Sequence, residues 1–386
     1  MKKLAIITSH PIQYNAPLFK KLSEQPDLCI KVYYTLGEAA HSFIDKGFGK
    51  MIAWDIPLLQ GYDYEFVKNI SQNPGTSSIK GIVNPDLIER IERFGPSHVL
   101  VYGWSFISHL KVMRYFHKKA IILFRGDSTL LDERMGIKTF LRRSFLHCVY
   151  RYVDIAFYVG YNNKVYFLKH GLSEHQLKFA PHAVDNVRFG DDLIYKEQSN
   201  YLRQELNIDQ DDIVFLFTGK FEKKKAPLLL VKAFKELNLS KAILLLVGNG
   251  VLEAQLHDEA KGYPNIKFLP FQNQSVMPAV YRTGDVLVLP SQGPGETWGL
   301  CLNEAMACGL PIIASDKVGG AIDLINEGEN GKIFEAGNLN DLKNIFLSFA
   351  SKDKRALKQM GEASKKLISR WNYDEVIHSL RTVILD

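Results

Sequence analysis

Short apolar runs alternate with amphipathic helical stretches along the whole chain. The runs are rich in Val, Ile, Leu and Phe and do not alternate with polar residues, a pattern typical of strands covered on both faces. They lie at residues 4–8, 30–34, 98–102, 120–124, 155–159 and 178–181, and then at residues 213–218, 242–247, 266–269, 286–290, 311–314 and 332–334. Helical stretches separate them, for example at residues 85–93, 228–237 and 339–349. The alternation predicts an α/β fold with parallel, doubly wound sheets.

These strands are too many for one compact α/β domain of typical size. The polar stretch 185–212, which precedes a new strand at Ile213, marks the break. We therefore expect two Rossmann-like domains, a first domain over residues 1–190 and a second domain over residues 191–365. Open sheets of this kind bind ligands outside the carboxyl ends of their strands, and two such sheets that face each other would share one cleft.

The composition is that of a folded protein, since 46% of the 386 residues are apolar and 23% are charged. No apolar run reaches the ~18 residues of a membrane span. The apolar start resembles a signal peptide, but polar residues from Ser9 onward interrupt it before a hydrophobic region of ~7–15 residues forms. Cys29, Cys148, Cys301 and Cys308 lack the paired spacing of a disulfide scaffold or a zinc site. We therefore expect a cytoplasmic protein with reduced thiols.

Charge is unevenly distributed along the chain. Residues 1–190 carry 25 Lys and Arg against 16 Asp and Glu, a net charge of +9, whereas residues 191–386 carry 23 against 26, a net charge of −3. A basic half indicates an anionic substrate or an anionic surface for the first domain. An ordinary soluble surface can have the same charge, so charge alone does not separate the two.

The strongest candidate site follows the strand at 286–290 and continues to residue 311. Its Gly-Pro-Gly run indicates a loop, and the loop opens a helix that ends at Gly309. Backbone N–H groups at the start of such a helix favour a phosphate or another anion. These N–H groups belong to Trp298, Gly299 and Leu300.

Two carboxylates flank this helix start. Glu296 comes just before the helix, and Glu304 lies inside it, where its carboxylate can accept two hydrogen bonds from a diol. A helix cap for Glu296 and a solvated face for Glu304 are the alternatives. Neither alternative accounts for the neighbouring Gly-Pro-Gly run or for Trp298.

With its surroundings, this block resembles glycosyltransferase family 4, also described as glycosyl transferases group 1, whose members are retaining enzymes of GT-B fold. Glu296 and Glu304 match the E-x7-E motif of that family. The resemblance implies that Glu296 contacts hydroxyls of the donor sugar and that Glu304 holds the ribose hydroxyls of the nucleotide. It also implies that amides near Gly299 and Leu300 hold the sugar or the diphosphate, and that a C-terminal helix, residues 366–386, packs back on the first domain.

A lysine-rich loop follows the strand at 213–218. Lys220 and Lys225 are five positions apart at the carboxyl end of that strand, where two cations suit a pyrophosphate; a solvated lysine run is the alternative. Members of the resembled family usually have Arg at the first position and Lys at the second, often followed by Gly. Here the pair is Lys and Lys followed by Ala226, which keeps the charge but loses the bidentate geometry of arginine.

Two further segments complete the donor side by resemblance. Gly248 and Asn249, after the strand at 242–247, resemble the turn that lets a nucleotide approach the backbone, although any βα turn can carry such a glycine. Phe271 lies in a segment similar to the one that reads the base, mostly through its main chain. A core position is the alternative for Phe271.

The first domain carries the acceptor side in this resemblance. Its first strand is followed by a proline-containing loop, in which His10, Gln13 and Tyr14 would face the acceptor. Asn15 would cap the next helix, with Pro17 in its first turn. Family members often have a Gly-Gly pair in this loop, and its absence here weakens the case for a direct contact with the donor phosphate.

Residues at the ends of two other strands join the acceptor side. Asp127 follows the strand at 120–124, where family members have His or Asp, and we expect it to be the acceptor-side catalytic residue, with Arg125 nearby. Trp104, at the end of the preceding strand, would line the same side. The alternative for Asp127 is the N-cap of a helix that begins near Leu130.

Residues 134–151 are predicted to form a basic helix. Apolar residues there are interleaved with Arg134, Lys138, Arg142, Arg143 and Arg151, as in helices that lie on anionic membrane surfaces. A core helix with a charged outer face is the commoner structure for this pattern.

Together, the motifs predict a retaining GT-B glycosyltransferase that uses a nucleoside-diphosphate sugar, with UDP favoured by its frequency among similar proteins, and that needs no metal or other cofactor. Glu296, Asp127 and Lys225 would be its catalytic residues. The acceptor would be a glycan, a glycolipid or another hydroxyl compound of surface polysaccharide or glycolipid assembly. Peripheral contact with an anionic membrane is one interpretation of the basic helix, whereas no stacking motif for nucleic acid accompanies the basic residues. A GT-B epimerase that acts on the nucleotide sugar and a non-catalytic protein that binds it are the alternatives.

Overall fold

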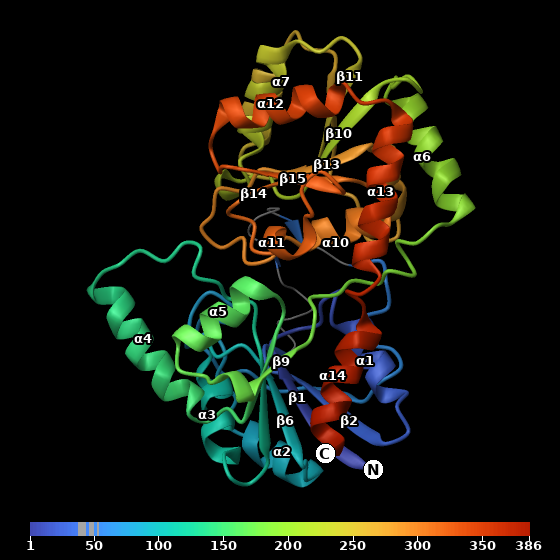
Figure 1. Ribbon diagram of the computed structural model, residues 1–386. Helices are drawn as coiled ribbons and strands as arrows, with labels where there is room; N and C mark the ends of the chain where they lie inside the picture. Colours follow the sequence, from blue (N-terminus) through green and yellow to red (C-terminus); the bar gives the residue numbers. More distant parts are fainter. Residues whose placement is uncertain (38–43, 46–49, 52–53) are drawn as a thin grey trace. The chain divides into compact units, whose positions relative to one another are not determined.

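The computed structural model describes residues 1–37, 44–45, 50–51 and 54–386, and the chain divides into two compact units (Figure 1). Unit 1 is formed by Met1–Phe43, Ile56–Pro181 and Tyr373–Asp386. Unit 2 is formed by Ile44–Asp55 and His182–Asn372.

Unit 1 is built on a seven-stranded sheet whose paired strands are all parallel. In spatial order its strands are β5 (Tyr64–Phe66), β2 (Leu28–Tyr34), β1 (Lys2–Thr8), β6 (His98–Tyr102), β7 (Ile121–Arg125), β8 (Ile155–Tyr158) and β9 (Leu177–Phe179). Its helices are α1 (Ala16–Ser23), α2 (Leu87–Phe94), α3 (Ile107–Phe116), α4 (Ile137–Tyr150), α5 (Tyr161–Lys169) and α14 (Tyr373–Leu385). The central strands are apolar and buried over most of their length because helices cover the sheet on both faces.

Unit 2 is built on a six-stranded parallel sheet. In spatial order its strands are β12 (Ile266–Leu269), β11 (Ala242–Val247), β10 (Ile213–Thr218), β13 (Val286–Leu289), β14 (Ile312–Ser315) and β15 (Gly331–Phe334). Its helices are α6 (Leu193–Glu205), α7 (Pro227–Leu237), α8 (Glu253–Glu259), α9 (Met277–Thr283), α10 (Leu300–Ala307), α11 (Ala321–Leu324), α12 (Leu339–Ala350) and α13 (Lys354–Ile368). The short strands β3 (Ile44–Asp45) and β4 (Lys50–Met51) pair antiparallel to each other.

Each sheet has a point where the strand order reverses. In unit 1 the chain leaves β1 toward β2 and leaves β6 toward β7 on the opposite side. In unit 2 it leaves β10 toward β11 and leaves β13 toward β14. Ligands of open α/β sheets bind outside the carboxyl ends of the strands at such a switch point. The topology therefore indicates four candidate ligand-binding loops, those after β1 and β6 in unit 1 and those after β10 and β13 in unit 2.

The predicted α/β fold with parallel sheets is confirmed, and every predicted strand is present within a few residues of its expected bounds. The structure adds the short strands β3 and β4, and it adds β5, which the apolar pattern did not indicate because its three residues are exposed or only partly buried. The helix predicted over residues 134–151 begins at Ile137.

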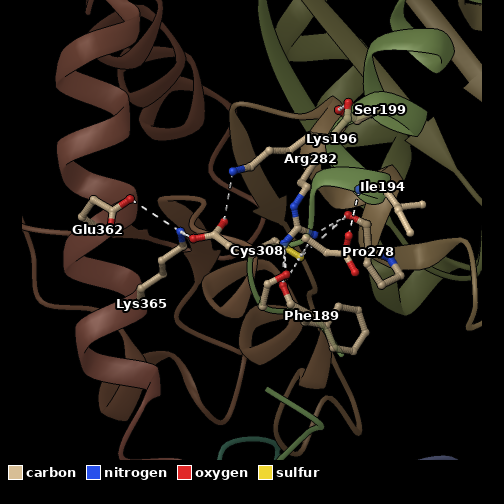
Figure 2. Close-up of polar contacts among 12 residues, drawn as sticks. Phe189, Ile194, Lys196, Ser199, Pro278, Arg282, Cys308, Glu362 and Lys365 are labelled. Atoms are coloured by element: carbon tan, nitrogen blue, oxygen red, sulfur yellow. Dashed lines mark hydrogen bonds and ion pairs between the residues drawn. The ribbon is translucent and has the colours of Figure 1, made fainter. Parts of the chain in front are cut away.

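The segment 182–190, which we expected in the first domain, belongs to unit 2. Arg282 of α9 donates a 2.8 Å hydrogen bond to the carbonyl of Phe189, as Figure 2 shows. Lys365 of α13 forms a 2.8 Å ion pair with Asp191, just beyond the segment. The break therefore lies between residues 181 and 182 rather than after residue 190.

The boundary before the C-terminal helix also lies later than expected, between residues 372 and 373 rather than after residue 365. Helix α13 continues to Ile368 within unit 2, and Asn186 donates to the carbonyls of Ile368 and Trp371 at 3.1 and 3.2 Å. The following helix, α14, belongs to unit 1, where Lys21 of α1 forms a 3.1 Å ion pair with Asp374.

Candidate active site

The switch point of unit 2 is formed by two loops that are bonded to each other. The lysine-rich loop after β10 continues into a short 3-10 helix at Lys223–Lys225, and the Gly-Pro-Gly loop follows β13. The backbone N–H of Gln292 donates to the carbonyl of Lys224 at 2.8 Å. The two segments that the sequence singled out are thus parts of one structure.

An ion pair joins these loops at their centre. The Lys225 ammonium lies 2.5 Å from the Glu296 carboxylate, and the two side chains are 16% and 9% exposed. The Ser291 hydroxyl donates to the same carboxylate oxygen at 2.8 Å. Burial, the largest single influence, opposes the charge on Lys225, but the Glu296 carboxylate together with Cys301 and Glu222 outweighs it, and the pKa of Lys225 is raised. The lysine is therefore held as a cation in a site from which most water is excluded.

Glu304 lies in the interior of α10, not on a solvated face. Its side chain is buried, and one carboxylate oxygen accepts a 2.6 Å hydrogen bond from the hydroxyl of Tyr281 in α9. The hydroxyls of Thr218 and Tyr281 lie 3.1 Å apart. Burial first, and then the Glu304 charge, raise the pKa of Tyr281 well above its ordinary value, so this hydroxyl stays a donor.

Tyr281 is a functional candidate that the sequence did not indicate, because it is 23 positions from Glu304 in the chain. Cys301, in the first turn of α10, is another neighbour of this site. Burial raises the pKa of its thiol to about 12, with the charges of Lys225, Glu296 and Glu304 acting on the same group. The thiol is therefore neutral and lies among the three predicted charged site residues.

Helix α10 begins at Leu300, with Gly299 as its N-cap at a φ of 91°. A Cβ at Gly299 would lie 2.8 Å from Val318 and 2.9 Å from Leu289, so both the left-handed backbone and the space require glycine. The first N–H groups of any α-helix have no partner within the helix, and they suit an anion. The sequence prediction for Gly299 and Leu300 is compatible with this geometry.

Trp298 differs from its neighbours because its side chain supports the loop. The indole is 3% exposed, and its Nε1 donates to Asn303 at 2.8 Å. Asn303 in turn donates to the carbonyl of His182 at 2.8 Å, and Gly320 packs against the ring. The prediction of donor binding by Trp298 therefore concerns its backbone amide alone.

Gly248 and Asn249 join neighbouring strand ends. A Cβ at Gly248 would lie 2.0 Å from the carbonyl oxygen of Gly219, so the protein's own backbone requires this glycine. The Asn249 side-chain oxygen accepts from the N–H of Phe271 at 2.7 Å, which ties the loop after β11 to the loop after β12. Lys220, half-buried, follows β10 beside this turn.

The acceptor-side predictions fall at the switch point of unit 1. His10 follows β1, with its Nδ1 at 2.9 Å from the Ser9 hydroxyl, and Gln13 and Tyr14 are half-buried in the same loop. Asn15 occupies the N-cap of α1 but makes no side-chain capping bond.

Trp104 follows β6, and its ring meets that of Phe145 in α4 edge to face at 5.8 Å between centroids. Asp127 is half-buried after β7. The alternative that Asp127 caps a helix near Leu130 is wrong, since the next helix begins at Ile137.

Arg125 has a structural task that we did not expect. Its guanidinium is buried and donates to the carbonyls of Ala180 at 3.0 Å and Pro181 at 2.8 Å, the last residues before the chain enters unit 2. Burial lowers its pKa, and the nearby Tyr102 and Asp127 charges partly offset that effect.

Unit 1 also contains a buried polar cluster around His109 of α3, which the sequence did not indicate. His109 of α3 lies with Nδ1 at 3.0 Å from the carbonyl of Gly103 and with Nε2 at 3.0 Å from the Thr35 hydroxyl. Asn84 donates to the carbonyl of Thr35 at 2.8 Å. Burial lowers the pKa of His109 to about 4, so the ring is neutral near pH 7.

The predicted site residues thus fall in two groups, a unit 2 cluster whose loops are joined by the contacts above and a unit 1 group that follows the carboxyl ends of three strands of one sheet. Among the residues that the structure describes, no group of three or more His, Cys, Asp or Glu side chains is placed to hold a metal ion. Within the same ranges, no helix is long and apolar enough to cross a membrane.

Residues 198–367, which include the unit 2 cluster, match the family described as glycosyl transferases group 1. The chain is 26% identical over 245 residues to N-acetyl-alpha-D-glucosaminyl L-malate synthase of Bacillus anthracis, a match that covers 60% of this chain and 62% of that protein. It is 32% identical over 182 residues to D-inositol 3-phosphate glycosyltransferase of Rhodococcus erythropolis, covering 43% and 40%. The chain thus spans about half the length of the curated relatives it matches.

Solved structures resemble the whole chain. Anabaena HepE, described as a complex with UDP, matches with a TM-score of 0.74 and 16% identity over 100% of both chains. Sucrose-phosphate synthase from Thermosynechococcus elongatus matches with a TM-score of 0.72 and 17% identity, over 99% of this chain and 98% of that one. At these identities the likeness shows the fold, which is GT-B. The match to the glycosyl transferases group 1 family therefore covers residues 198–367, within a chain whose fold is GT-B.

Proposed function

We propose that this protein is a retaining glycosyltransferase that moves a sugar from a nucleoside-diphosphate sugar to a hydroxyl group, without a metal ion. The observation that carries the proposal is the buried pair of Lys225 and Glu296 beside the Gly299-capped start of α10. The pair and the helix start together place a cation, a carboxylate and backbone amides at a sheet switch point, and this combination suits a diphosphate joined to a sugar.

The chemistry follows from where charge develops. The bond between the sugar C1 and the phosphate oxygen breaks, and negative charge grows on the leaving diphosphate. Lys225, Lys220 and the amides of α10 stabilise that charge in a site that excludes most water. The acceptor oxygen attacks C1 from the same face, and the leaving phosphate oxygen takes the acceptor's proton. Glu296 orients the sugar hydroxyls while C1 is electron-poor.

The remaining unit 2 residues hold the nucleotide. Glu304 accepts hydrogen bonds from the two ribose hydroxyls, and Tyr281 fixes one oxygen of its carboxylate for this purpose. UDP is the favoured diphosphate because Anabaena HepE, of similar fold, is described in complexes with UDP and with UDP-glucose. Asp127, with His10, Gln13, Tyr14 and Trp104, forms the acceptor side of unit 1.

A membrane-proximal acceptor, such as a glycolipid, is part of this proposal, with the enzyme peripheral on the cytoplasmic face. Its support is α4, whose apolar residues Ile137, Phe140 and Leu141 are 81%, 69% and 61% exposed. These side chains follow helical spacing, and exposed basic residues flank them. An exposed apolar face with basic flanks suits the surface of an anionic bilayer.

The first experiment is a thermal-shift panel of UDP-, GDP-, ADP- and dTDP-sugars with wild-type protein and with Glu304→Gln. One nucleotide class should raise the Tm of the wild type and raise it less in the variant, because a ligand that binds the native state stabilises it. No shift with any nucleotide sugar at millimolar concentration would contradict the proposal.

Measuring turnover distinguishes a glycosyltransferase from an epimerase and from a non-catalytic binding protein. A glycosyltransferase should release the nucleoside diphosphate faster when an acceptor is present, and the product should keep the anomeric configuration of the donor. Conversion of the donor sugar without an acceptor would indicate an epimerase instead. Binding without any turnover would indicate a non-catalytic protein.

A further inference from the structure

Trp54 and Asp55 come from the first half of the sequence but belong to unit 2 by their contacts. The two oxygens of the Asp55 carboxylate accept from the backbone N–H of Ser275 at 3.1 and 3.3 Å, and one of them also accepts from the Ser275 hydroxyl. The Asp55 N–H points at the side-chain oxygen of Asn273 at 3.4 Å. A carboxylate with several donors is thus anchored on a loop 220 residues away.

The loop that receives Asp55 is itself firmly held. It follows β12, and Asn249 binds its Phe271 N–H at 2.7 Å. The Arg188 guanidinium donates to the backbone oxygen of Gln274 at 2.6 Å and to its side-chain oxygen at 2.7 Å. Asp55 therefore attaches to a segment that several side-chain hydrogen bonds hold, and its neighbour in the chain is Trp54.

That residue, Trp54, brings an aromatic ring to Phe271. The ring centroids lie 6.3 Å apart with an angle of 58° between the planes. Both side chains are only half-buried. Two half-exposed aromatic rings that meet at the carboxyl edge of a sheet offer flat apolar surface to a planar ligand.

The order of the strands indicates which planar ligand. The proposed phosphate contacts lie at β10 and β13, and Phe271 follows β12, two strands beyond β10. Neighbouring strands are separated by about 4.8 Å, so this distance is about 10 Å, the scale of a ribose and a base.

We propose that Trp54 and Phe271 together form the wall against which the nucleobase of the donor stacks, and that Asp55 is the residue that positions Trp54. The inference rests on the proposed function and adds to it a base contact from the first half of the chain. Stacking on aromatic rings tolerates any base, so this wall adds affinity for the nucleotide without selecting uracil.

The test compares ligands with and without a base. The Kd of UDP and of inorganic pyrophosphate is measured by calorimetry on the full chain for wild type, Trp54→Ala and Trp54→Phe, with GDP, ADP and dTDP in parallel. Tyr201→Ala, an exposed aromatic position on α6, is the matched control. Loss of a stacked ring should weaken UDP binding by about tenfold in Trp54→Ala, and Trp54→Phe should restore most of the affinity. Pyrophosphate binding should not change.

Other results overturn the inference in distinguishable ways. Unchanged UDP affinity in Trp54→Ala would refute base stacking on Trp54 and would leave the proposed function intact. An equal loss for UDP and pyrophosphate would also overturn the wall, because the effect would not depend on the base. Failure of the wild type to bind any of the nucleoside diphosphates would overturn the proposed function and the wall with it.

The role of Asp55 has its own readout. Asp55→Ala should raise the donor KM severalfold with kcat retained, because Asp55 acts only through Trp54. Asp55→Asn should recover part of the effect, since its amide oxygen can still accept from Ser275. Asp258→Ala on α8 serves as the control acid. A fall in kcat at constant KM, or no change in either constant, would contradict a positioning role.

Discussion

Glu296 and Lys225 are a pair of opposite charges that are both almost fully removed from water. Removing one partner of such a pair costs about 3–5 kcal/mol, since the other charge is left buried and uncompensated. The same charges are the groups expected to act on a leaving diphosphate. Stability and activity must therefore be separated in any test of this pair.

Lys225→Met should lower kcat by about 100-fold or more, because it removes a cation that stabilises the transition state. It should also lower the Tm by leaving Glu296 unpaired. Steady-state kinetics and thermal unfolding measure the two effects. The double variant Lys225→Met/Glu296→Gln should regain stability without regaining activity, and the exposed Lys223→Met is the matched control. Wild-type kcat in Lys225→Met would remove this lysine from the mechanism.

Tyr281→Phe should raise the donor KM and leave kcat within about twofold. The variant removes one hydrogen bond to the Glu304 carboxylate, and a hydrogen bond to a charged group contributes about 1.5–3 kcal/mol. Donor KM and UDP affinity are the measurements, with Tyr201→Phe as a surface control. A loss of kcat at unchanged KM would show that Tyr281 acts on the chemical step instead.

At the scale of elements, the start of α10 and the exposed face of α4 are the features with the clearest consequences. The helix start depends on one glycine that has both a left-handed backbone and two close neighbours. The α4 face leaves large apolar side chains in water while only Leu146, Val149 and Tyr150 of that helix are buried. The start of α10 is thus determined by packing inside unit 2, whereas α4 exposes an apolar surface to solvent.

Gly299→Ala should destabilise unit 2 more than Gly295→Ala does. Both glycines have a φ near 90°, which costs an alanine about 1–2 kcal/mol. A Cβ at Gly295 would meet nothing within 4 Å, whereas one at Gly299 would collide with Val318 and Leu289. Urea unfolding of the two variants separates backbone strain from packing. Equal losses of unfolding free energy would show that the neighbours adapt without cost.

Phe140→Glu and Leu141→Glu should abolish cosedimentation with vesicles that contain anionic lipid, because each places a negative charge in the apolar face of α4. Wild-type binding should weaken as salt is raised. Leu347→Glu, at a 47% exposed position on α12, should bind like the wild type. Failure of the wild type to bind anionic vesicles at low salt would refute membrane contact through this helix.

At the scale of the whole molecule, the chain passes between the two units at residues 43–44, 55–56, 181–182 and 372–373. At the passage 181–182, Arg125 binds the carbonyls on the unit 1 side. Arg282 and Lys365 hold the segment that follows on the unit 2 side (Figure 2). Unit 1 also encloses the His109 cluster, which gives its stability a dependence on pH.

Acidification from about pH 6.5 to pH 4 should destabilise unit 1. The pKa of His109 is about 4 in the folded protein, below the ~6.5 of an unfolded chain, so the unfolded state takes up the proton first as the pH falls. Above pH 6.5 the ring is neutral in both states and contributes no pH dependence. The urea midpoint against pH measures the effect, and His109→Gln should flatten the profile. The same slope in both proteins would assign it to other groups.

The sequence determined much of this protein because its signals are local. Period and composition fixed the strands and their parallel arrangement, since a strand buried on both faces must be apolar throughout. Lys220 and Lys225 come in the loop after β10 and Glu296 comes in the loop after β13, so their order in the chain already indicated the carboxyl edge of the unit 2 sheet. Glu304, inside α10, was singled out by its spacing from Glu296 in the motif of the resembled family.

Only the tertiary structure decided which partners these residues meet. Tyr281 binds Glu304, Arg125 binds the carbonyls of Ala180 and Pro181, and His109 contacts Thr35. Each of these bonds joins residues that are distant in the chain, and no local pattern encodes such pairs. The same holds for the limits of the two units, since the segment 182–190 and Asp55 are hydrogen-bonded within unit 2 although they come from the first half of the sequence. Propensity and periodicity act over a few residues, whereas burial and long-range hydrogen bonds depend on the complete fold.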